Sequence, residues 1–194
     1  MIINKEIKLL IADFDGTLVD TFQANYHAYR KAFKKNGLLE LTEDFYKECF
    51  GLRFEAFMDK AKIPNNFIRE NIRKDKMEAY TSFFDMLKPN ETLINFIKAF
   101  KKAGGKTAIA STARKENLMK VVEYLQLEST FDIILSGKDV TRGKPDPEIY
   151  NKVLEMTGTD ADNALVFEDS EIGVKAAEAA GISYIKINSD YYGD

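Results

Sequence analysis

Cysteine and histidine are almost missing from this chain of 194 residues, which contains one of each, Cys49 and His27. A single thiol excludes an internal disulfide framework and a zinc cluster built mainly from thiolates. A Ser-His-Asp or Cys-His hydrolase would have to use His27, which falls in a segment with a helical pattern. For such a histidine, packing or surface placement is the interpretation that we favour.

Long apolar runs and a strong excess of one charge are also missing. The longest apolar run near the N-terminus, Leu9 to Ala12, is too short for a signal sequence or a membrane span. Lys and Arg number 28 and Asp and Glu 31, a net charge of -3 that gives no broad electrostatic reason to expect nucleic acid. We therefore expect a cytoplasmic protein whose partners are neither membranes nor nucleic acids.

Two common phosphate-binding loops are lacking as well. No Gly-x-Gly-x-x-Gly follows the first predicted strand, so a dinucleotide site has no support. The segment 137–144 resembles a P-loop, but five residues separate Gly137 from Gly143 where four are needed. Pro145 also stands where a P-loop has the Ser or Thr that binds Mg²⁺.

The composition that is present is that of a soluble globular protein, with 45% hydrophobic and 30% charged residues. Its length allows one domain, or one domain with a smaller insertion. Residues 21–88 hold 13 Lys and Arg against 10 Asp and Glu, and 13 of the 23 aromatic residues. This shift in composition predicts two modules that meet near residue 20 and again near residue 88.

Outside residues 21–88, short apolar runs alternate with helical patterns, which is typical of β-α repeats around a parallel sheet. Runs that are apolar on both faces suit strands covered by helices on each side. We therefore predict a doubly wound, mainly parallel, Rossmann-like α/β sheet. The predicted strands are Ile7 to Ala12, Lys106 to Ala110, Phe131 to Leu135, Ala164 to Phe167 and Tyr184 to Ile187.

Residues 21–88 contain no convincing strand and predict an inserted helical module. Phe54, Phe57, Met58 and Ala61 recur at the spacing of one helical face, and Pro64 follows them. We expect the aromatic residues of this module to form its own core and not a platform for substrate.

The strongest local signal is an acidic pair at the end of the first predicted strand, in Asp13-Phe14-Asp15-Gly16-Thr17. Ligand sites in open parallel sheets lie beyond the carboxyl ends of the strands. Side chains alternate in an extended segment, so Asp13 and Asp15 are expected on similar sides. Two carboxylates so close repel each other unless a cation or a proton lies between them, which indicates Mg²⁺ and divided roles. A turn with acidic caps is the alternative.

Three further polar clusters follow predicted strands. Ser111 and Thr112 precede a helical pattern, where an anion is favoured, although a helix N-cap is the commoner role of such hydroxyls. Lys144 lies in a loop that two prolines stiffen. Glu168 and Asp169 lie beside a buried run, which is costly unless they are paired or bound to metal; a charge pair at a helix N-terminus is the alternative. Four such clusters at successive strand ends are improbable by coincidence.

This order of acid pair, hydroxyl, lysine and acid pair resembles the four motifs of the haloacid dehalogenase superfamily of phosphotransferases. The corresponding positions are Asp13 to Thr17, Ser111, Lys144 and Glu168-Asp169, and they extend over nearly the whole chain.

The helical insertion resembles the cap of the subgroup that includes β-phosphoglucomutase and phosphoglycolate phosphatase. The resemblance implies a catalytic α/β core formed by residues 1–20 and 89–194, with a helical cap over residues 21–88. Arg53 falls where related enzymes present a substrate-binding cap loop, and a solvated helix start is its alternative role.

The resemblance also implies a role for each motif. Asp13 would attack phosphorus and form an aspartyl-phosphate, and Asp15 would protonate the leaving oxygen and then deprotonate the attacking water. Ser111, Thr112 and Lys144, with nearby backbone N–H groups, would hold the phosphoryl oxygens.

The metal that the resemblance implies is Mg²⁺. An Asp13 oxygen, the backbone carbonyl of Asp15 and Asp169 would hold it, with Glu168 bound directly or through water. The presence of Asp15 also argues against a dehalogenase, which lacks a general acid at this position.

These expectations lead to a Mg²⁺-dependent phosphatase that acts on a small phosphorylated metabolite as a monomer, with a dimer as the alternative. A hexose-phosphate mutase of the same fold is the first alternative. Asn25 stands where the mutase subgroup has its cap histidine, which favours hydrolysis. A non-catalytic phosphate-binding module is the second alternative. The presence of all four motifs argues against it.

Overall fold

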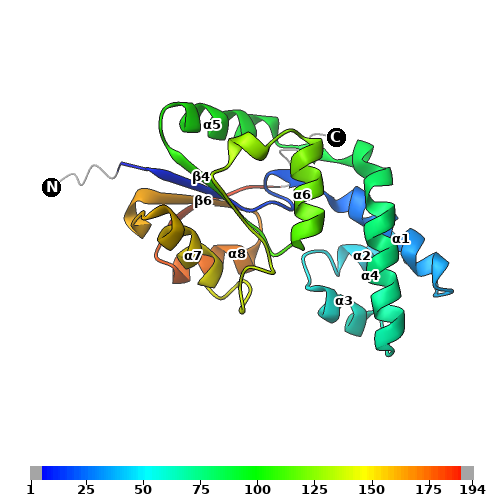
Figure 1. Cartoon of the computed structure of the whole chain (residues 1–194). Coiled ribbons are helices and arrows are strands. Elements are labelled where there is room, and N and C mark those ends of the chain that lie inside the picture. Colours follow the sequence, from blue (N-terminus) through cyan, green and yellow to red (C-terminus); the bar gives the residue numbers. More distant parts are fainter. Residues whose placement is uncertain (1–5, 189–194) are drawn as a thin grey trace. The chain divides into compact units, whose positions relative to one another are not determined.

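The computed structural model describes residues 6–188, which divide into two compact units (Figure 1). The α/β unit contains the residues up to Asp20 and those from Lys88 onward, and the helical unit is Thr21–Leu87. These limits lie within one residue of the composition boundaries. That the two units serve as catalytic core and cap stays a prediction.

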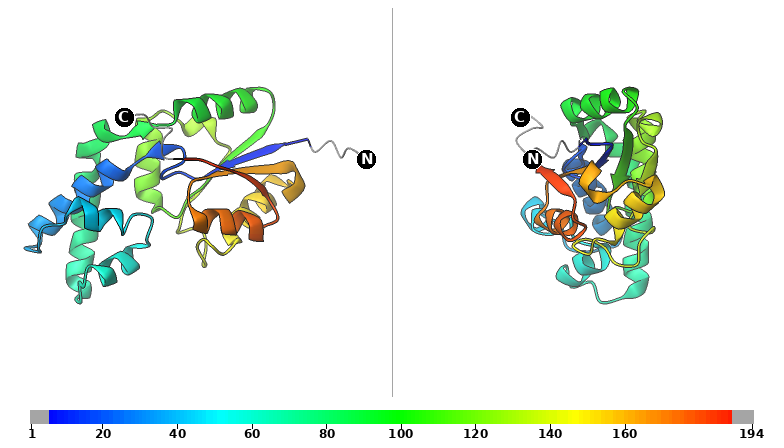
Figure 2. Two further views of the ribbon diagram at one scale, coloured as in Figure 1. Left: turned by 180° about the vertical axis from the view of Figure 1, so that it is seen from behind. Right: turned by 90° about the vertical axis from the view of Figure 1, so that its left-hand side faces the viewer.

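A parallel sheet of five strands forms the centre of the α/β unit (Figure 2). The strand order is β5-β4-β1-β6-β7, and each neighbouring pair is parallel. The strands are β1 (Leu9–Ala12), β4 (Lys106–Ala110), β5 (Ile133–Leu135), β6 (Ala164–Glu168) and β7 (Ser183–Lys186). The predicted doubly wound α/β fold is confirmed.

Helices cover both faces of this sheet, and α5 lies on the opposite side from α7 and α8 (Figures 1 and 2). All four residues of β1 are buried, because the central strand has a helical layer on each side. The helices of this unit are α5 (Glu91–Lys102), α6 (Lys115–Tyr124), α7 (Glu148–Thr157) and α8 (Glu171–Ala179), with short 3-10 turns η2 (Glu128–Thr130) and η3 (Ala161–Asn163).

A small antiparallel ribbon escaped the sequence analysis. It joins β2 (Val19–Asp20) to β3 (Lys88–Pro89), at the two positions where the chain passes between the units. Strands of two residues are too short to show any alternation, so periodicity cannot reveal them.

The helical unit contains α1 (Phe22–Lys35), α2 (Glu43–Lys47), α3 (Phe54–Lys60), α4 (Asn66–Tyr80) and the 3-10 turn η1 (Thr81–Met86). Helices α1 and α4 lie side by side (Figure 1). Its core includes the buried rings of Tyr26, Phe33, Tyr46 and Phe57. The prediction that the aromatic residues form the unit's own core is confirmed for these rings, whereas Phe67 is exposed.

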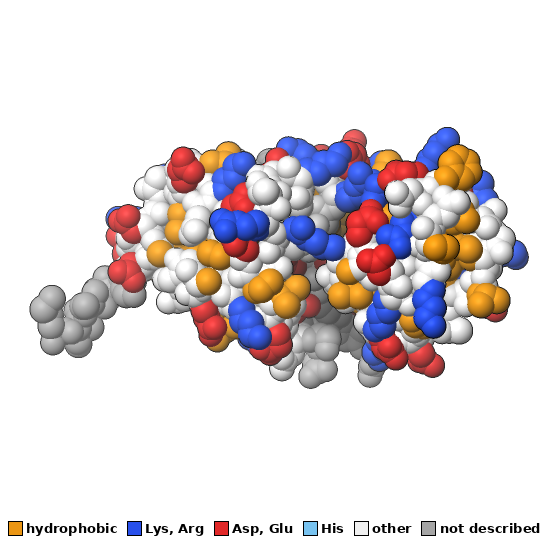
Figure 3. Space-filling view, turned by 90° about the horizontal axis from the view of Figure 1, so that it is seen from below, with side chains coloured by type: hydrophobic (Ala, Val, Ile, Leu, Met, Phe, Trp, Pro, Cys, Tyr) orange, Lys and Arg blue, Asp and Glu red, His pale blue; other side chains and the backbone are white. Residues whose placement is uncertain are grey.

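The surface carries charges of both signs. On the face shown in Figure 3, Lys and Arg side chains are interspersed with Asp and Glu side chains and do not separate into a region of one sign. Within residues 6–188, no helix has both the length and the apolar character needed to cross a membrane.

Candidate active site

Three of the four predicted motifs lie at the carboxyl ends of the central strands, and Lys144 lies in the loop between β5 and α7. Strand β1 pairs with β4 on one side and with β6 on the other, and Asp13 follows β1 directly. Ser111 follows β4, and Glu168 is the last residue of β6. Chain connections leave β1 and β6 in opposite directions, and such a switch point is where open α/β sheets form ligand sites.

Lys144 is the centre of a buried ionic cluster. Its Nζ donates to Asp13 Oδ1 and to Glu168 Oε1, both at 2.6 Å. All three residues are buried, and Glu168 has no exposed surface. Burial alone would lower the pKa of Lys144, but the neighbouring acidic groups raise it well above its usual value, so the lysine is charged.

Glu168 is held through both of its carboxylate oxygens. Besides Lys144, Oε1 accepts a longer hydrogen bond of 3.4 Å from the hydroxyl of Tyr150. Oε2 accepts from the backbone N–H and the hydroxyl of Ser170, each at 2.9 Å. Ser170 Oγ also accepts from Gly173 N at 3.1 Å, so Ser170 caps α8.

Gly173 leaves room for the Glu168 carboxylate, and replacing it by Ala tests this packing. An added Cβ would lie 1.7 Å from Glu168 Oε1, so the carboxylate or α8 must move. We expect Gly173→Ala to lower kcat for phosphomonoester hydrolysis by about tenfold or more, since a displacement of about 1 Å near a catalytic group can be that costly.

The matched control for this substitution is Gly181→Ala. Gly181 has a φ of +71°, and nothing lies within 4 Å of its added Cβ. The control should lose about 1 kcal/mol of stability through its backbone conformation and keep its kcat. Equal kcat values for the two folded variants, measured by phosphate release, would show that the Glu168 packing has no role in activity.

Asp169 lies against the loop that follows β1. Thr17 Oγ1 donates to Asp169 Oδ1 at 3.0 Å. Burial raises the pKa of Asp169, and the adjacent Glu168 raises it further, while the Thr17 hydrogen bond opposes the shift. Gly16 has a φ of +87°, and a Cβ there would lie 2.3 Å from Asp169 Oδ2. Glycine is therefore required at this position both for its conformation and for the approach of Asp169.

A tight turn follows Asp13 in the loop after β1. Strand β1 ends at Ala12, and the carbonyl of Phe14 accepts from the backbone N–H groups of Leu18 and Val19. Asp13 itself continues the ladder, because its N–H donates to the carbonyl of Phe167 at 2.9 Å, and the shared side of Asp13 and Asp15 stays a prediction. Asp15 is half-buried and bridges to Val19.

Asn90 fixes the far side of this turn. Its Nδ2 donates to the carbonyl of Thr17 at 3.3 Å, and its Oδ1 accepts from Leu93 N and caps α5. One buried side chain thus ties the turn to the start of a helix. Sequence reasoning did not identify Asn90, although an Asn before a helical pattern is an N-cap signal.

Three of the predicted metal ligands converge. Asp13, Glu168 and Asp169 each offer an oxygen within 4.8 Å of the others. Burial raises the pKa of Asp13 well above its usual value, while Lys144 opposes that shift. Asp13 is buried and Asp169 is half-buried, and three carboxylates so close together fit a hard divalent cation. The Asp15 side chain is not part of this cluster.

Ser111 is buried at the end of β4, and its Oγ accepts from Ala113 N at 3.0 Å. The N-cap of α6 is Arg114, so neither Ser111 nor Thr112 has the N-cap role that was their alternative. Thr112 is half-buried, and Gly137 packs so closely that a Cβ there would lie 2.5 Å from the carbonyl oxygen of Thr112. The contacts of Ser111 and Thr112 with phosphate stay predictions.

The remaining candidates belong to the helical unit. Arg53 is exposed at the N-cap position of α3, and its contact with substrate stays a prediction. His27 is half-buried and stacks on Phe83 with ring centroids 5.5 Å apart, as its packing interpretation expects. Cys49 is buried, and burial raises the pKa of its thiol.

Tyr150 is the main site residue that the sequence analysis missed. Its side chain is fully buried in α7, and Lys144 Nζ lies 5.0 Å from the centre of its ring. Burial raises the pKa of its hydroxyl, which stays protonated and can donate to Glu168. The available signal was an aromatic residue on the first turn of the helix that follows the lysine loop.

Comparisons with known proteins agree with this arrangement. The family model described as haloacid dehalogenase-like hydrolase matches residues 10–187. A phosphorylated carbohydrates phosphatase of Thermotoga maritima is 31% identical over 187 residues, covering 92% of this chain and 84% of the relative. A phosphoglycolate phosphatase of Aquifex aeolicus is 26% identical over 195 residues, covering 94% of this chain and 89% of the relative.

The fold also matches solved structures. The crystal structure of CbbY from Rhodobacter sphaeroides in complex with phosphate aligns with a TM-score of 0.83 and 24% identity. The alignment covers 96% of this chain and 88% of that one. At this identity the similarity establishes the shared fold.

Proposed function

Because this chain belongs to the haloacid dehalogenase-like hydrolase family and is an enzyme that acts as a phosphatase, we propose that it hydrolyses a small phosphomonoester through a covalent intermediate on Asp13. The observation that carries the proposal is the buried cluster of Asp13, Lys144 and Glu168 at the switch point of the sheet. The names of the two relatives support a sugar phosphate or a similar metabolite as substrate.

In this proposal, Asp13 is the nucleophile. Lys144 holds its Oδ1, which leaves Oδ2 to form the bond to phosphorus as the ester P–O bond breaks. Asp15 donates its proton to the leaving oxygen. It then takes a proton from the water that attacks the phosphorus of the aspartyl-phosphate, so that phosphate leaves and Asp13 is restored. The charge of Lys144, together with Ser111, Thr112 and nearby backbone N–H groups, offsets the charge of the phosphoryl oxygens.

The family generally uses a divalent metal ion, and the acidic cluster fits one. Asp13 would hold Mg²⁺ through the carboxylate oxygen that does not attack phosphorus, together with Asp169 and the backbone carbonyl of Asp15. Both carboxylate oxygens of Glu168 already accept hydrogen bonds, so in this proposal Glu168 orients Lys144 and would contact the ion through water. When bound, the ion supplies positive charge to the transferring phosphoryl group.

Metal removal is expected to abolish activity and to lower thermal stability. Phosphate release from an aryl phosphate should fall to background after chelation and return with Mg²⁺. Added Mg²⁺ should also raise the melting temperature, because a ligand of the folded state stabilises it. Asp169→Asn should lose this shift, while Asp160→Asn, an exposed position of the same unit, should keep it. A shift retained in Asp169→Asn would exclude this residue as a ligand.

The hexose-phosphate mutase is the alternative that the relatives' names do not favour. Asn25 stands in place of the mutase histidine, and its Nδ2 donates to Thr21 Oγ1 at 3.0 Å. We expect glucose 1-phosphate, if it is turned over, to yield glucose and inorganic phosphate. Accumulation of glucose 6-phosphate, measured with a coupled dehydrogenase, would overturn the hydrolase assignment and restore the mutase.

A further inference from the structure

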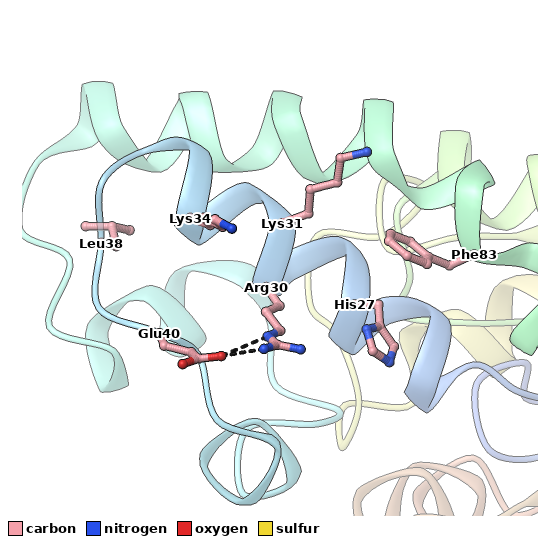
Figure 4. A pocket seen from close by; sticks show the side chains of 7 residues that line it. All are labelled: His27, Arg30, Lys31, Lys34, Leu38, Glu40 and Phe83. Carbon is pink, nitrogen blue, oxygen red and sulfur yellow. Dashed lines mark hydrogen bonds and ion pairs between the residues drawn. The ribbon is translucent and has the colours of Figure 1, made fainter.

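A cavity lies within the helical unit, along one face of α1 (Figure 4). His27, Arg30, Lys31 and Lys34 follow the spacing i, i+3, i+4, i+7, which places them on the same side of the helix. Leu38, Glu40 and Phe83 complete the lining. The cavity volume is about 580 Å³, within the range of small-molecule sites.

The charge of this cavity is positive. Arg30, Lys31 and Lys34 face a single acidic residue, Glu40. Glu40 accepts from Arg30 Nε at 3.1 Å, so one of the three cations is already paired. Across residues 6–188, neither Lys31 nor Lys34 forms an ion pair. Two unpaired cations and a shared third are suited to an anion with several charges.

One end of the cavity is aromatic. The rings of His27 and Phe83 stack at 29° with centroids 5.5 Å apart. Figure 4 shows these two rings at one end of the row and Leu38 at the other, with the basic side chains between. An apolar ring surface next to a row of cations fits a ligand with a flat ring at one end and negative charge along its length.

This cavity is not on the side of α1 that the resemblance assigns to substrate. At 100° per residue, Asn25 lies about 200° around the helix from His27. The basic row therefore faces away from the direction of Asn25, and it is not needed for the hydrolysis proposed above.

We propose that this cavity binds a nucleoside polyphosphate. Its base would stack on Phe83, and its phosphates would follow Arg30, Lys31 and Lys34. His27 and Lys34 are seven residues apart, which on a helix is a rise of about 10 Å, enough for a chain of phosphate groups. The proposal assigns the helical unit a binding site of its own, beyond its predicted role as a cap.

The test is calorimetric titration of the full chain with ATP in the presence of a chelator, at low salt. We expect Lys31→Ala/Lys34→Ala to weaken ATP binding by about tenfold or more, as the loss of two nearby charges implies. The matched control is Lys47→Ala, which removes a lysine from the last turn of another helix of the same unit, as Lys34→Ala does from α1. It should leave the affinity unchanged.

Two further variants test the sign of the charge in the cavity and the role of its aromatic end. Glu40→Gln frees Arg30 and removes a repulsive charge, so it should tighten ATP binding by about threefold or more. Phe83→Ala should weaken binding of ATP by about tenfold and leave binding of inorganic tripolyphosphate unchanged, since a stacked base contributes on this scale.

Several results would overturn the proposal. They are the absence of ATP binding, equal losses in Lys47→Ala and in the double lysine variant, or equal effects of Phe83→Ala on ATP and tripolyphosphate. Loss of binding in Asp13→Asn would also overturn it, because the ligand would then occupy the phosphatase site. Phosphate release by the double lysine variant tests the hydrolase assignment separately, and we expect it to persist.

Discussion

Asp13→Asn is expected to lower kcat/KM for phosphomonoester hydrolysis by at least about 10⁴-fold, the scale on which loss of a nucleophile acts. The amide has nearly the shape of the carboxylate, and its oxygen can still accept the hydrogen bond from Lys144. It cannot form the bond to phosphorus. Phosphate release from an aryl phosphate at saturating Mg²⁺ measures the effect.

Two comparisons make this result specific. Asp160→Asn makes the same chemical change at an exposed position of the α/β unit and should retain full activity. Circular dichroism should show Asp13→Asn folded, because removing one of three clustered carboxylates relieves repulsion between them. Activity within tenfold of the unmodified chain would exclude Asp13 as nucleophile.

The second large effect is expected for Lys144→Ala, in both activity and stability. The substitution leaves Asp13, Glu168 and Asp169 without the buried positive charge that separates them. Breaking a buried ion pair by removing one partner lowers the free energy of unfolding by about 3–5 kcal/mol. We also expect a loss of about 10³-fold or more in kcat, since Lys144 holds the nucleophile and offsets phosphoryl charge.

Lys175→Ala is the control, because Lys175 is an exposed lysine on α8. It should change neither the denaturant midpoint nor the rate. The Lys144→Ala rate must be measured at a temperature where the variant is folded by circular dichroism. A folded variant with unchanged kcat would mean that Lys144 is only a structural counter-ion.

Much of the α/β unit can be predicted from the chain because its central strand β1 is buried on both faces. Leu9 to Ala12 is apolar at every position, and such runs next to helical patterns favour a parallel sheet. Polar residues directly after these runs must then meet at one edge. Asp13, Ser111 and Glu168 follow this rule, which is why a topological argument could place them together before any distance was known.

The features that the sequence does not reveal depend on contacts between segments that are distant in the chain. Tyr150 is a site residue only because its hydroxyl approaches Glu168, which is distant in sequence, and its ring approaches Lys144 of the preceding loop. The hydrogen bonds that Leu18 and Val19 donate to the carbonyl of Phe14 in the turn after Asp13 are visible only in the structure. The basic cavity of α1 needs η1 to bring Phe83 beside His27.

The central claim is that hydrolysis passes through a phosphorylated Asp13, and the stereochemical course at phosphorus tests it most directly. The substrate would be a thiophosphate ester whose phosphorus is made chiral by sulfur and oxygen isotopes. It would be hydrolysed in isotopically labelled water, and the configuration of the released thiophosphate would then be determined. Two successive in-line displacements, first by Asp13 and then by water, predict net retention. Net inversion would mean a single direct attack by water and would contradict the covalent intermediate.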